Sequence, residues 1–276
     1  MTGFELQGHR GARGLFPENT LDGFVRAVGF GLDSIELDIA VTSDGVAVVV
    51  HDPVLNRDLV RLPDGAWLSG EGAPILTLSF AQVQQFDVGR IRPGSKLAMA
   101  HPDQVPSDGA RIPALSEVFE VTRVSGVIID AELKTDPAKP ELTVPPEAMA
   151  NMVVDIARTA SALDRLAIRS FDWRGLAYLR HAHPAIPLAW LTDAGSDSST
   201  PDRVAQAASG CLFTPTWAPF HGVLDQAALD RAHALGLRVV PWTVNEPSDM
   251  ARLIGWGVDG LCTDRPDLAA PLRSLR

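Results

Sequence analysis

The chain has 276 residues, and its 34 acidic and 24 basic side chains give a formal net charge of −10. This balance argues against a surface for nucleic acid or an anionic membrane, and no apolar run reaches the length of a membrane span. The N-terminal residues lack the features of a signal peptide, and the two cysteines, Cys211 and Cys262, lack the spacing of a zinc site. We therefore expect a cytoplasmic protein with free thiols, with no nucleic-acid partner and no stable membrane insertion. The pattern does not indicate an oligomeric state.

Strand-like and helix-like segments alternate along the chain. The predicted strands are residues 6–9, 35–39, 127–133, 166–171, 188–191, 211–214, 238–244 and 260–263. The predicted helices are residues 20–29, 115–122, 146–161, 173–181, 202–208, 225–235 and 247–256. Eight such units in a chain of this length predict a TIM (β/α)8 barrel that occupies residues 1–276 as a single domain.

One segment, residues 53–111, interrupts this alternation. It is rich in proline and glycine, and only residues 78–86 have a helical pattern. A structureless loop of this length is improbable inside a compact domain. We therefore expect a small inserted subdomain after the second barrel strand, next to the mouth of the barrel.

The second predicted strand carries a pair of carboxylates. Polar and apolar residues alternate from Ser34 to Ile39, so Glu36 and Asp38 point to one face of the strand. Two carboxylates on one face repel each other unless a cation lies between them. The spacing therefore indicates a cation site.

A hairpin would bring a histidine to this pair. Residues 42–45 have the composition of a turn, and residues 46–50 that of a returning strand. A turn centred between Ser43 and Asp44 would place Asp38 opposite Val49 and Glu36 opposite His51. A slip of one residue would turn His51 to the other face.

Further polar groups follow the predicted strands, where a barrel carries its chemistry. His9 and Arg10 end the first strand, and Glu132 and Lys134 end the third at a spacing that places them on one face. Oxygen ligands suit a hard cation such as Ca²⁺ or Mg²⁺, and imidazoles suit proton transfer near neutral pH. Each group has an alternative interpretation, as a solvated rim carboxylate in an ion pair or as a structural histidine.

These residues resemble the glycerophosphodiester phosphodiesterase family, and the match runs in order along nearly the whole chain. The matching motifs are His9-Arg10-Gly11, Pro17-Glu18-Asn19-Thr20, Ile35-Glu36-Leu37-Asp38, Thr42-Ser43-Asp44-Gly45, His51-Asp52, Ile112-Pro113-Ala114-Leu115, Glu132-Leu133-Lys134, Ser170-Phe171, Trp242-Thr243-Val244-Asn245 and Thr263-Asp264-Arg265-Pro266.

The resemblance implies a TIM barrel with an insertion between its second strand and second helix, and a role for each of several residues. The implied ligands of a divalent cation (Ca²⁺ or Mg²⁺, with Mn²⁺ as a further candidate) are Glu36, Asp38 and Glu132. The implied acid–base pair is His9 and His51. The residues implied to contact the substrate are Arg10 and Lys134 at the phosphate and Trp242 in the pocket.

Four further positions carry interpretations of their own. Glu18 and Asn19 precede the first helix, where we expect them to support the site, with capping of the helix by Asn19 as the alternative. Asp130 and Arg169 stand where the family often has Asn and Gln, so they bear on substrate preference. Trp242 has a core position as its alternative.

The expected reaction is metal-dependent hydrolysis of a glycerophosphodiester to sn-glycerol 3-phosphate and an alcohol. Which histidine acts as acid, and whether water or the glycerol 2-hydroxyl attacks, stay open. A lysophospholipase D or phospholipase C-like enzyme on the same scaffold is the alternative, and a catalytically silent binding barrel is a remote one. We expect the leaving alcohol to lie toward residues 53–111 and the glycerol phosphate near Trp242.

Overall fold

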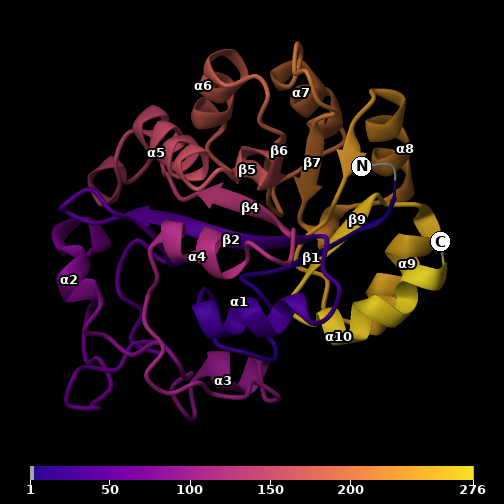
Figure 1. The fold of residues 1–276 in the computed structure, drawn as a ribbon. Coiled ribbons are helices and arrows are strands. Elements are labelled where there is room, and N and C mark those ends of the chain that lie inside the picture. Colours follow the sequence, from indigo (N-terminus) through magenta and orange to yellow (C-terminus); the bar gives the residue numbers. More distant parts are fainter. Residues whose placement is uncertain (1–2, 276) are drawn as a thin grey trace.

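The computed structural model describes residues 3–275, which form a barrel of parallel strands surrounded by helices (Figure 1). The strands are β1 (Glu5–Gly8), β2 (Ser34–Val41), β3 (Ala47–Val49), β4 (Ile128–Leu133), β5 (Leu166–Ser170), β6 (Leu188–Thr192), β7 (Thr216–Pro219), β8 (Arg238–Val239) and β9 (Gly260–Thr263). The helices are α1 (Leu21–Val28), α2 (Phe80–Val83), α3 (Lys96–Ala100), α4 (Leu115–Val121), α5 (Pro146–Thr159), α6 (Trp173–Ala182), α7 (Thr200–Ala207), α8 (Gln226–Ala234), α9 (Pro247–Trp256) and α10 (Pro266–Ala269). Short 3₁₀ turns are η1 (Ile75–Thr77), η2 (Pro140–Leu142), η3 (Leu163–Arg165), η4 (His221–Val223) and η5 (Ala270–Leu275).

The barrel strands follow the order β8-β7-β6-β5-β4-β2-β1-β9, with every neighbouring pair parallel. Backbone hydrogen bonds rather than a regular ladder join the two ends of this order. The Cys262 N–H donates to the Pro241 carbonyl at 3.0 Å, and the Asp259 N–H to the Val239 carbonyl at 2.9 Å. The barrel is therefore nearly closed, and its first and last strands, β1 and β9, lie side by side.

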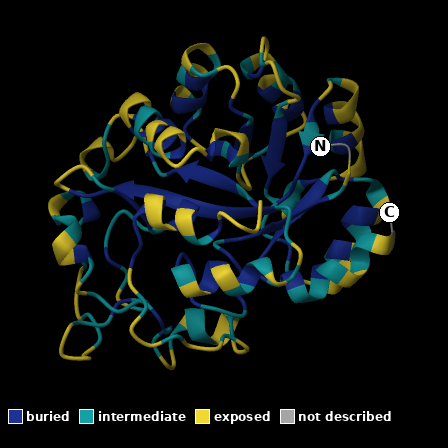
Figure 2. Ribbon diagram, in the orientation of Figure 1, coloured by how far each residue is buried: buried dark blue, intermediate teal, exposed yellow. Residues whose placement is uncertain are grey.

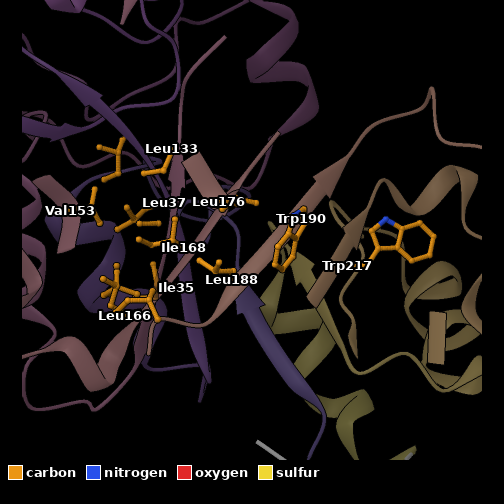
Figure 3. Close-up of a cluster of buried hydrophobic side chains, with 14 of the residues drawn as sticks. Ile35, Leu37, Leu133, Val153, Leu166, Ile168, Leu176, Leu188, Trp190 and Trp217 are labelled. Carbon is orange, nitrogen blue, oxygen red and sulfur yellow. The ribbon is translucent and has the colours of Figure 1, made fainter. Parts of the chain in front are cut away.

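The alternation predicted for β2 sorts its side chains between two environments. Ile35 and Leu37 belong to the apolar cluster between the strands and the helix layer, which also contains Val153 of α5 (Figure 3). The intervening Glu36 and Asp38 are buried on the opposite side, toward the barrel interior. One strand thus anchors the core and supplies the carboxylates.

The helices bury one face against the barrel and expose the other (Figure 2). Helix α1 begins after Thr20, whose side-chain oxygen accepts a hydrogen bond from the Gly23 N–H. Helix α9 ends at Gly257, whose φ of +93° is left-handed and favours glycine. All seven predicted outer helices are present, whereas α3 and α10 were not expected.

One predicted strand is wrong. Residues 211–214 form no strand, and β7 instead begins at Thr216. The apolar side chains that suggested a strand are exposed, Leu212 to 73% and Phe213 to 48%, whereas Trp217 is buried. An apolar run in a surface loop therefore imitated a strand, and β8 likewise covers only the first two residues of its predicted range.

The predicted register of the β2–β3 hairpin is wrong by one residue. Val49 pairs with Ile39, whereas the prediction placed it opposite Asp38. The turn contains three residues, 43–45, and the last of them, Gly45, has a φ of +80°. His51 still reaches the site, because it lies past the end of β3, where strand pairing no longer sets its direction.

Residues 53–111 contain η1, α2 and α3 joined by turns and isolated bridges (Figure 1). Their apolar side chains, such as Val60 and Ile75, form a second small cluster with Ala40 and Val48 of the hairpin. That this segment is a separate subdomain stays a prediction. Among the described residues, no helix is long and apolar enough to cross a membrane.

Candidate active site

Three carboxylates meet at the carboxyl ends of β2 and β4. The two strands are paired in parallel with Asp38 beside Glu132, and Glu36 stands two residues earlier on the same face. One oxygen from each of the three carboxylates lies within 4.8 Å of the other two, and all three residues are buried. The structure therefore brings together the three ligands predicted from the sequence.

The charges of this cluster are incompletely balanced. Burial, followed by the nearby Asp38 carboxylate, raises the pKa of Glu36 well above its usual value. Burial also opposes ionisation of Asp38, but nearby cationic groups, led by Arg10, hold the pKa of Asp38 below its usual range. Asp38 Oδ1 is buried without a hydrogen-bond partner. A buried carboxylate oxygen that receives no hydrogen bond, in an all-oxygen cluster, fits a hard divalent cation.

Lys134 and Arg10 provide the positive charge at the cluster. Lys134 Nζ lies 2.7 Å from Glu132 Oε1 and 3.6 Å from Asp38 Oδ1. Arg10 Nε lies 3.4 Å from Asp38 Oδ2, and the Arg10 backbone N–H donates to Glu36 Oε2 at 3.0 Å. The backbone of Arg10 has a φ of 50°, a left-handed conformation that is strained for arginine. Both cations are thus ion-paired with the carboxylates of the cluster.

Glu18 and Asn19 support this arrangement from the turn before α1. Asn19 Nδ2 donates to Asp38 Oδ2 at 2.9 Å, and Arg10 Nη1 donates to Glu18 Oε1 at 2.8 Å. The alternative that Asn19 caps α1 is wrong, because Thr20 is the capping residue. Glu18 and Asn19 instead orient one cation and one carboxylate of the cluster.

His9 lies at the end of β1 with each ring nitrogen facing a carboxylate. Its Nδ1 is 2.6 Å from Asp264 Oδ1, and its Nε2 is 3.9 Å from Glu36 Oε2. Burial lowers the pKa of His9 to about 4, so the ring is neutral at pH 7. Because the Asp264 carboxylate only accepts, Nδ1 carries the proton and Nε2 presents its lone pair to the site.

Asp264 is itself held from two sides. Arg13 donates to both Asp264 oxygens at 3.1 Å, and Asn245 Nδ2 donates to Asp264 Oδ2 at 2.7 Å. Burial disfavours ionisation of Asp264, but its interactions with the His9 ring and the Arg13 guanidinium outweigh burial and lower the pKa of Asp264. The ionised carboxylate is therefore a fixed acceptor for the imidazole.

His51 has a similar partner in a more open setting. Its Nδ1 lies 2.7 Å from Asp52 Oδ1, and Asn56 Nδ2 donates to Asp52 Oδ2 at 2.7 Å. The side chains of His51 and Asp52 are 31% and 34% exposed, compared with 10% and 1% for His9 and Asp264. The two predicted histidines thus share one hydrogen-bonding pattern but differ in access to solvent.

Sequence reasoning missed the partners of the histidines. Asp52, Asp264 and Asn245 lie inside the motifs quoted above, but no role was given to them, and Arg13 was not considered. The sequence did contain a signal that Asp264 lies next to His9. It follows the last predicted strand, which must lie beside the first strand, and therefore beside His9, when a barrel closes.

The comparisons with known proteins agree with this geometry. The model of the Glycerophosphoryl diester phosphodiesterase family matches residues 9–268. The chain belongs to this family. It is similar to protein YqiK of Bacillus subtilis, at 32% identity with 96% of each chain covered, and to a glycerophosphodiester phosphodiesterase of Caldanaerobacter subterraneus subsp. tengcongensis, at 28% identity with 94% and 93% covered.

Solved structures extend the similarity to the fold. A crystal structure from Silicibacter pomeroyi, assigned as a glycerophosphoryl diester phosphodiesterase, has a TM-score of 0.91 and 32% identity and covers 99% of this chain and 93% of its own. A phosphodiesterase of Oleispira antarctica in complex with the product sn-glycerol-3-phosphate has a TM-score of 0.76 at 23% identity, with 99% and 97% of the chains covered. The chain is accordingly a phosphoric diester hydrolase on a TIM barrel.

In this family member an aromatic cluster covers one side of the barrel mouth. The Trp242 ring, which follows β8, lies 5.4 Å from the Phe171 ring at the end of β5 and 5.7 Å from the Phe220 ring. Trp242 Nε1 donates to the Ala218 carbonyl at 3.0 Å, which fixes the ring. Trp242 is only partly buried, so its core interpretation is wrong. The three aromatic rings therefore lie on the β5–β8 side of the barrel mouth, whereas the carboxylates lie on the β1–β4 side.

The two residues that are atypical for the family form one buried pair. Arg169 of β5 donates to Asp130 of β4, and Gln7 Nε2 donates to Asp130 Oδ2 at 2.9 Å. The guanidinium is 2% exposed and the carboxylate 4%. Asp130 lies two residues before Glu132 on β4, and Arg169 is paired with Glu132 across the β4–β5 register. The opposite charges of Asp130 and Arg169 compensate each other inside the barrel.

Proposed function

We propose that the enzyme hydrolyses glycerophosphodiesters to sn-glycerol 3-phosphate and an alcohol, with a divalent cation held by Glu36, Asp38 and Glu132. The observation that carries this proposal is the buried trio of carboxylates flanked by two carboxylate-supported histidines. Membership of the family supports the substrate class. The product bound to the Oleispira antarctica phosphodiesterase supports the identity of the retained half.

The protein side chains have distinct tasks in this proposal. When bound, the cation (Ca²⁺, Mg²⁺ or Mn²⁺) would offset negative charge on the phosphoryl oxygens. Arg10 and Lys134 contact the same phosphate, Arg10 through its planar fork and Lys134 as a point charge. Trp242 borders the retained glycerol.

In this proposal the two histidines carry out the proton transfers. Asp264 and Asp52 each accept a hydrogen bond from Nδ1, so both rings are held with Nε2 available to the reacting groups. We propose that His9, shielded and neutral, takes the proton of the nucleophile, and that His51 protonates the departing oxygen.

The proposal is tested by metal removal. Dialysis against a chelator should reduce hydrolysis of glycerophosphoethanolamine to background, and Ca²⁺, Mg²⁺ or Mn²⁺ should restore it. In the same experiment Glu132→Gln should weaken cation binding, measured by titration calorimetry, whereas Glu120→Gln on the exposed face of α4 should not. Full activity after complete demetallation would refute the cation's role.

The other candidate activities have less support. A lysophospholipase D would benefit from an apolar rim for lipid, but the exposed large apolar residues in the 53–111 segment are Met99 and Val105, which are too few for a docking patch. We also propose that the chain is one domain with residues 53–111 as a small subdomain, supported by the separate apolar cluster of that segment. A cytoplasmic location remains a proposal that the free cysteines support.

A further inference from the structure

A cavity of about 350 Å³ opens beside the carboxylate cluster. One wall is formed by residues 51–53 at the end of β3, and the facing wall by residues 132–143, which end β4 and continue into η2. Phe171 and Asp172 close a third side. We call this space the head-group cavity.

The head-group cavity lies on the side of one histidine only. His51 lines it together with Glu132 and Lys134, whereas His9 does not, and His9 Nε2 instead faces Glu36. In phosphoryl transfer the attacking and leaving oxygens stand roughly in line on opposite sides of phosphorus. The proposed function assigns the departing oxygen to His51, so the space beside His51 lies on the leaving-group side of phosphorus.

We propose that the head-group cavity receives the leaving alcohol of the diester and limits its size to that of small polar alcohols. This inference rests on the proposed function and specifies its substrate class. It places the alcohol away from the 53–111 segment, where the sequence analysis expected it, because that segment contributes Pro53 alone to the cavity wall.

The residues of the cavity wall explain why the enzyme would select the leaving alcohol by its size and not by its charge. A volume of about 350 Å³ is near the lower end for ligand pockets. Pro53, Pro137 and Leu142 supply apolar surface, while Asp136 and Lys139 are exposed side chains of opposite sign. The other acidic lining residues, Asp52, Glu132 and Asp172, are hydrogen-bonded to His51, Lys134 and Arg174. The wall therefore gives cationic, neutral and anionic head groups similar surroundings. A bulky alcohol would instead be excluded by the turn η2, which carries Leu142.

The test fills the cavity from this turn. Leu142→Trp should lower kcat/KM for glycerophosphoinositol by roughly tenfold or more, the scale of steric discrimination in a pocket, and should leave glycerophosphoethanolamine within about threefold. Leu142→Ala, which enlarges the cavity, should raise kcat/KM for glycerophosphoinositol relative to kcat/KM for glycerophosphoethanolamine. The matched control is Ser196→Trp, which fills the separate cavity on the other side of Phe171. Thermal unfolding confirms that each variant is folded.

Three results would overturn the inference. Equal losses for both substrates in Leu142→Trp would show that the retained glycerol phosphate occupies the cavity. Size selectivity from Ser196→Trp but not from either Leu142 variant would place the alcohol beyond Phe171. A wild-type enzyme that hydrolyses no glycerophosphodiester would refute the proposed function, and the inference would fail with it. The first two results, in contrast, would refute only the inference, because the wild-type enzyme would still be active.

Discussion

His9 and His51 have the same hydrogen-bonding pattern, but their surroundings differ, which supports our proposal that they carry out different proton transfers. The His9–Asp264 pair is shielded, and Arg13 and Asn245 fix its carboxylate. His51 borders the head-group cavity and keeps part of its ring in solvent. A group that must meet leaving alcohols of different shapes benefits from such access. This difference supports our proposal that His51 acts as the acid and His9 as the base.

Substrates with different leaving groups test this division. His51→Ala should lose about 10²–10⁴-fold in kcat on glycerophosphoethanolamine, and far less on the p-nitrophenyl ester of glycerol 3-phosphate. Nitrophenolate departs without being protonated, so the missing acid no longer matters. His9→Ala should lose activity on both substrates, because each still needs the base. Greater rescue of His9→Ala than of His51→Ala by the activated substrate would reverse the assignment.

Between elements, the Asp130–Arg169 pair links β4 to β5 beside the carboxylate cluster, since Asp130 is paired with Glu36 and Arg169 with Glu132 in the strand register. Burial disfavours the charged guanidinium, but the neighbouring Asp130 raises the pKa of Arg169 and keeps it charged. A buried ion pair adds little net stability relative to a neutral pair of similar size. Loss of one partner, however, leaves the other charge buried and unpaired.

A double-mutant cycle should show this coupling. Asp130→Asn and Arg169→Gln should each reduce the free energy of unfolding by about 3–5 kcal/mol. The double variant, in which neither charge remains, should lose much less than the sum of the two. Urea unfolding of the four proteins measures the cycle. Additive losses would mean that the two side chains do not compensate each other.

Secondary structure was predicted correctly from the sequence where the local alternation of polar and apolar residues was sufficient. The prediction failed where contacts with residues distant in the sequence determine the structure. Alternation alone placed Glu36 and Asp38 together inside the barrel. The hairpin register failed because a turn of three residues rather than two shifts every pair. Residues 211–214 have the apolar composition of a strand, and only their exposure in the fold shows otherwise. Asp264 was missed because its partner His9 is 255 positions away in the chain.

For the whole molecule, protonation of His9 couples stability to pH. The pKa of His9 is about 4 in the folded protein, against an ordinary value of 6.5 for an unburied histidine. Between these values the unfolded chain binds more protons, so acidification favours unfolding. Asp264 is ionised in both states over this range, because its folded pKa is lowered, and its contribution is lost only at more acidic pH. The raised pKa of Glu36 acts in the opposite direction, so the effect of His9 must be isolated by comparison.

Measurements of unfolding at two pH values isolate the contribution of His9. In the presence of a chelator, the wild-type protein should lose about 2 kcal/mol more stability between pH 7 and pH 5 than His9→Gln does. Both proteins keep Glu36, so its contribution cancels in the difference. Urea titrations at the two pH values provide the four free energies. Equal pH dependence in the two proteins would show that His9 is not held neutral by the fold.

The contact between His9 and Asp264 also ties catalytic competence to the order in which the chain assembles. The three carboxylates of the proposed cation site lie on β2 and β4, whereas Asp264 directly follows β9, which comes after the other described strands in the sequence. A chain whose final strand has not yet docked beside β1 already has its carboxylates but not the acceptor that orients His9. If His9 is the base, as we propose, docking of β9 beside β1 both closes the barrel and completes the setting of the base.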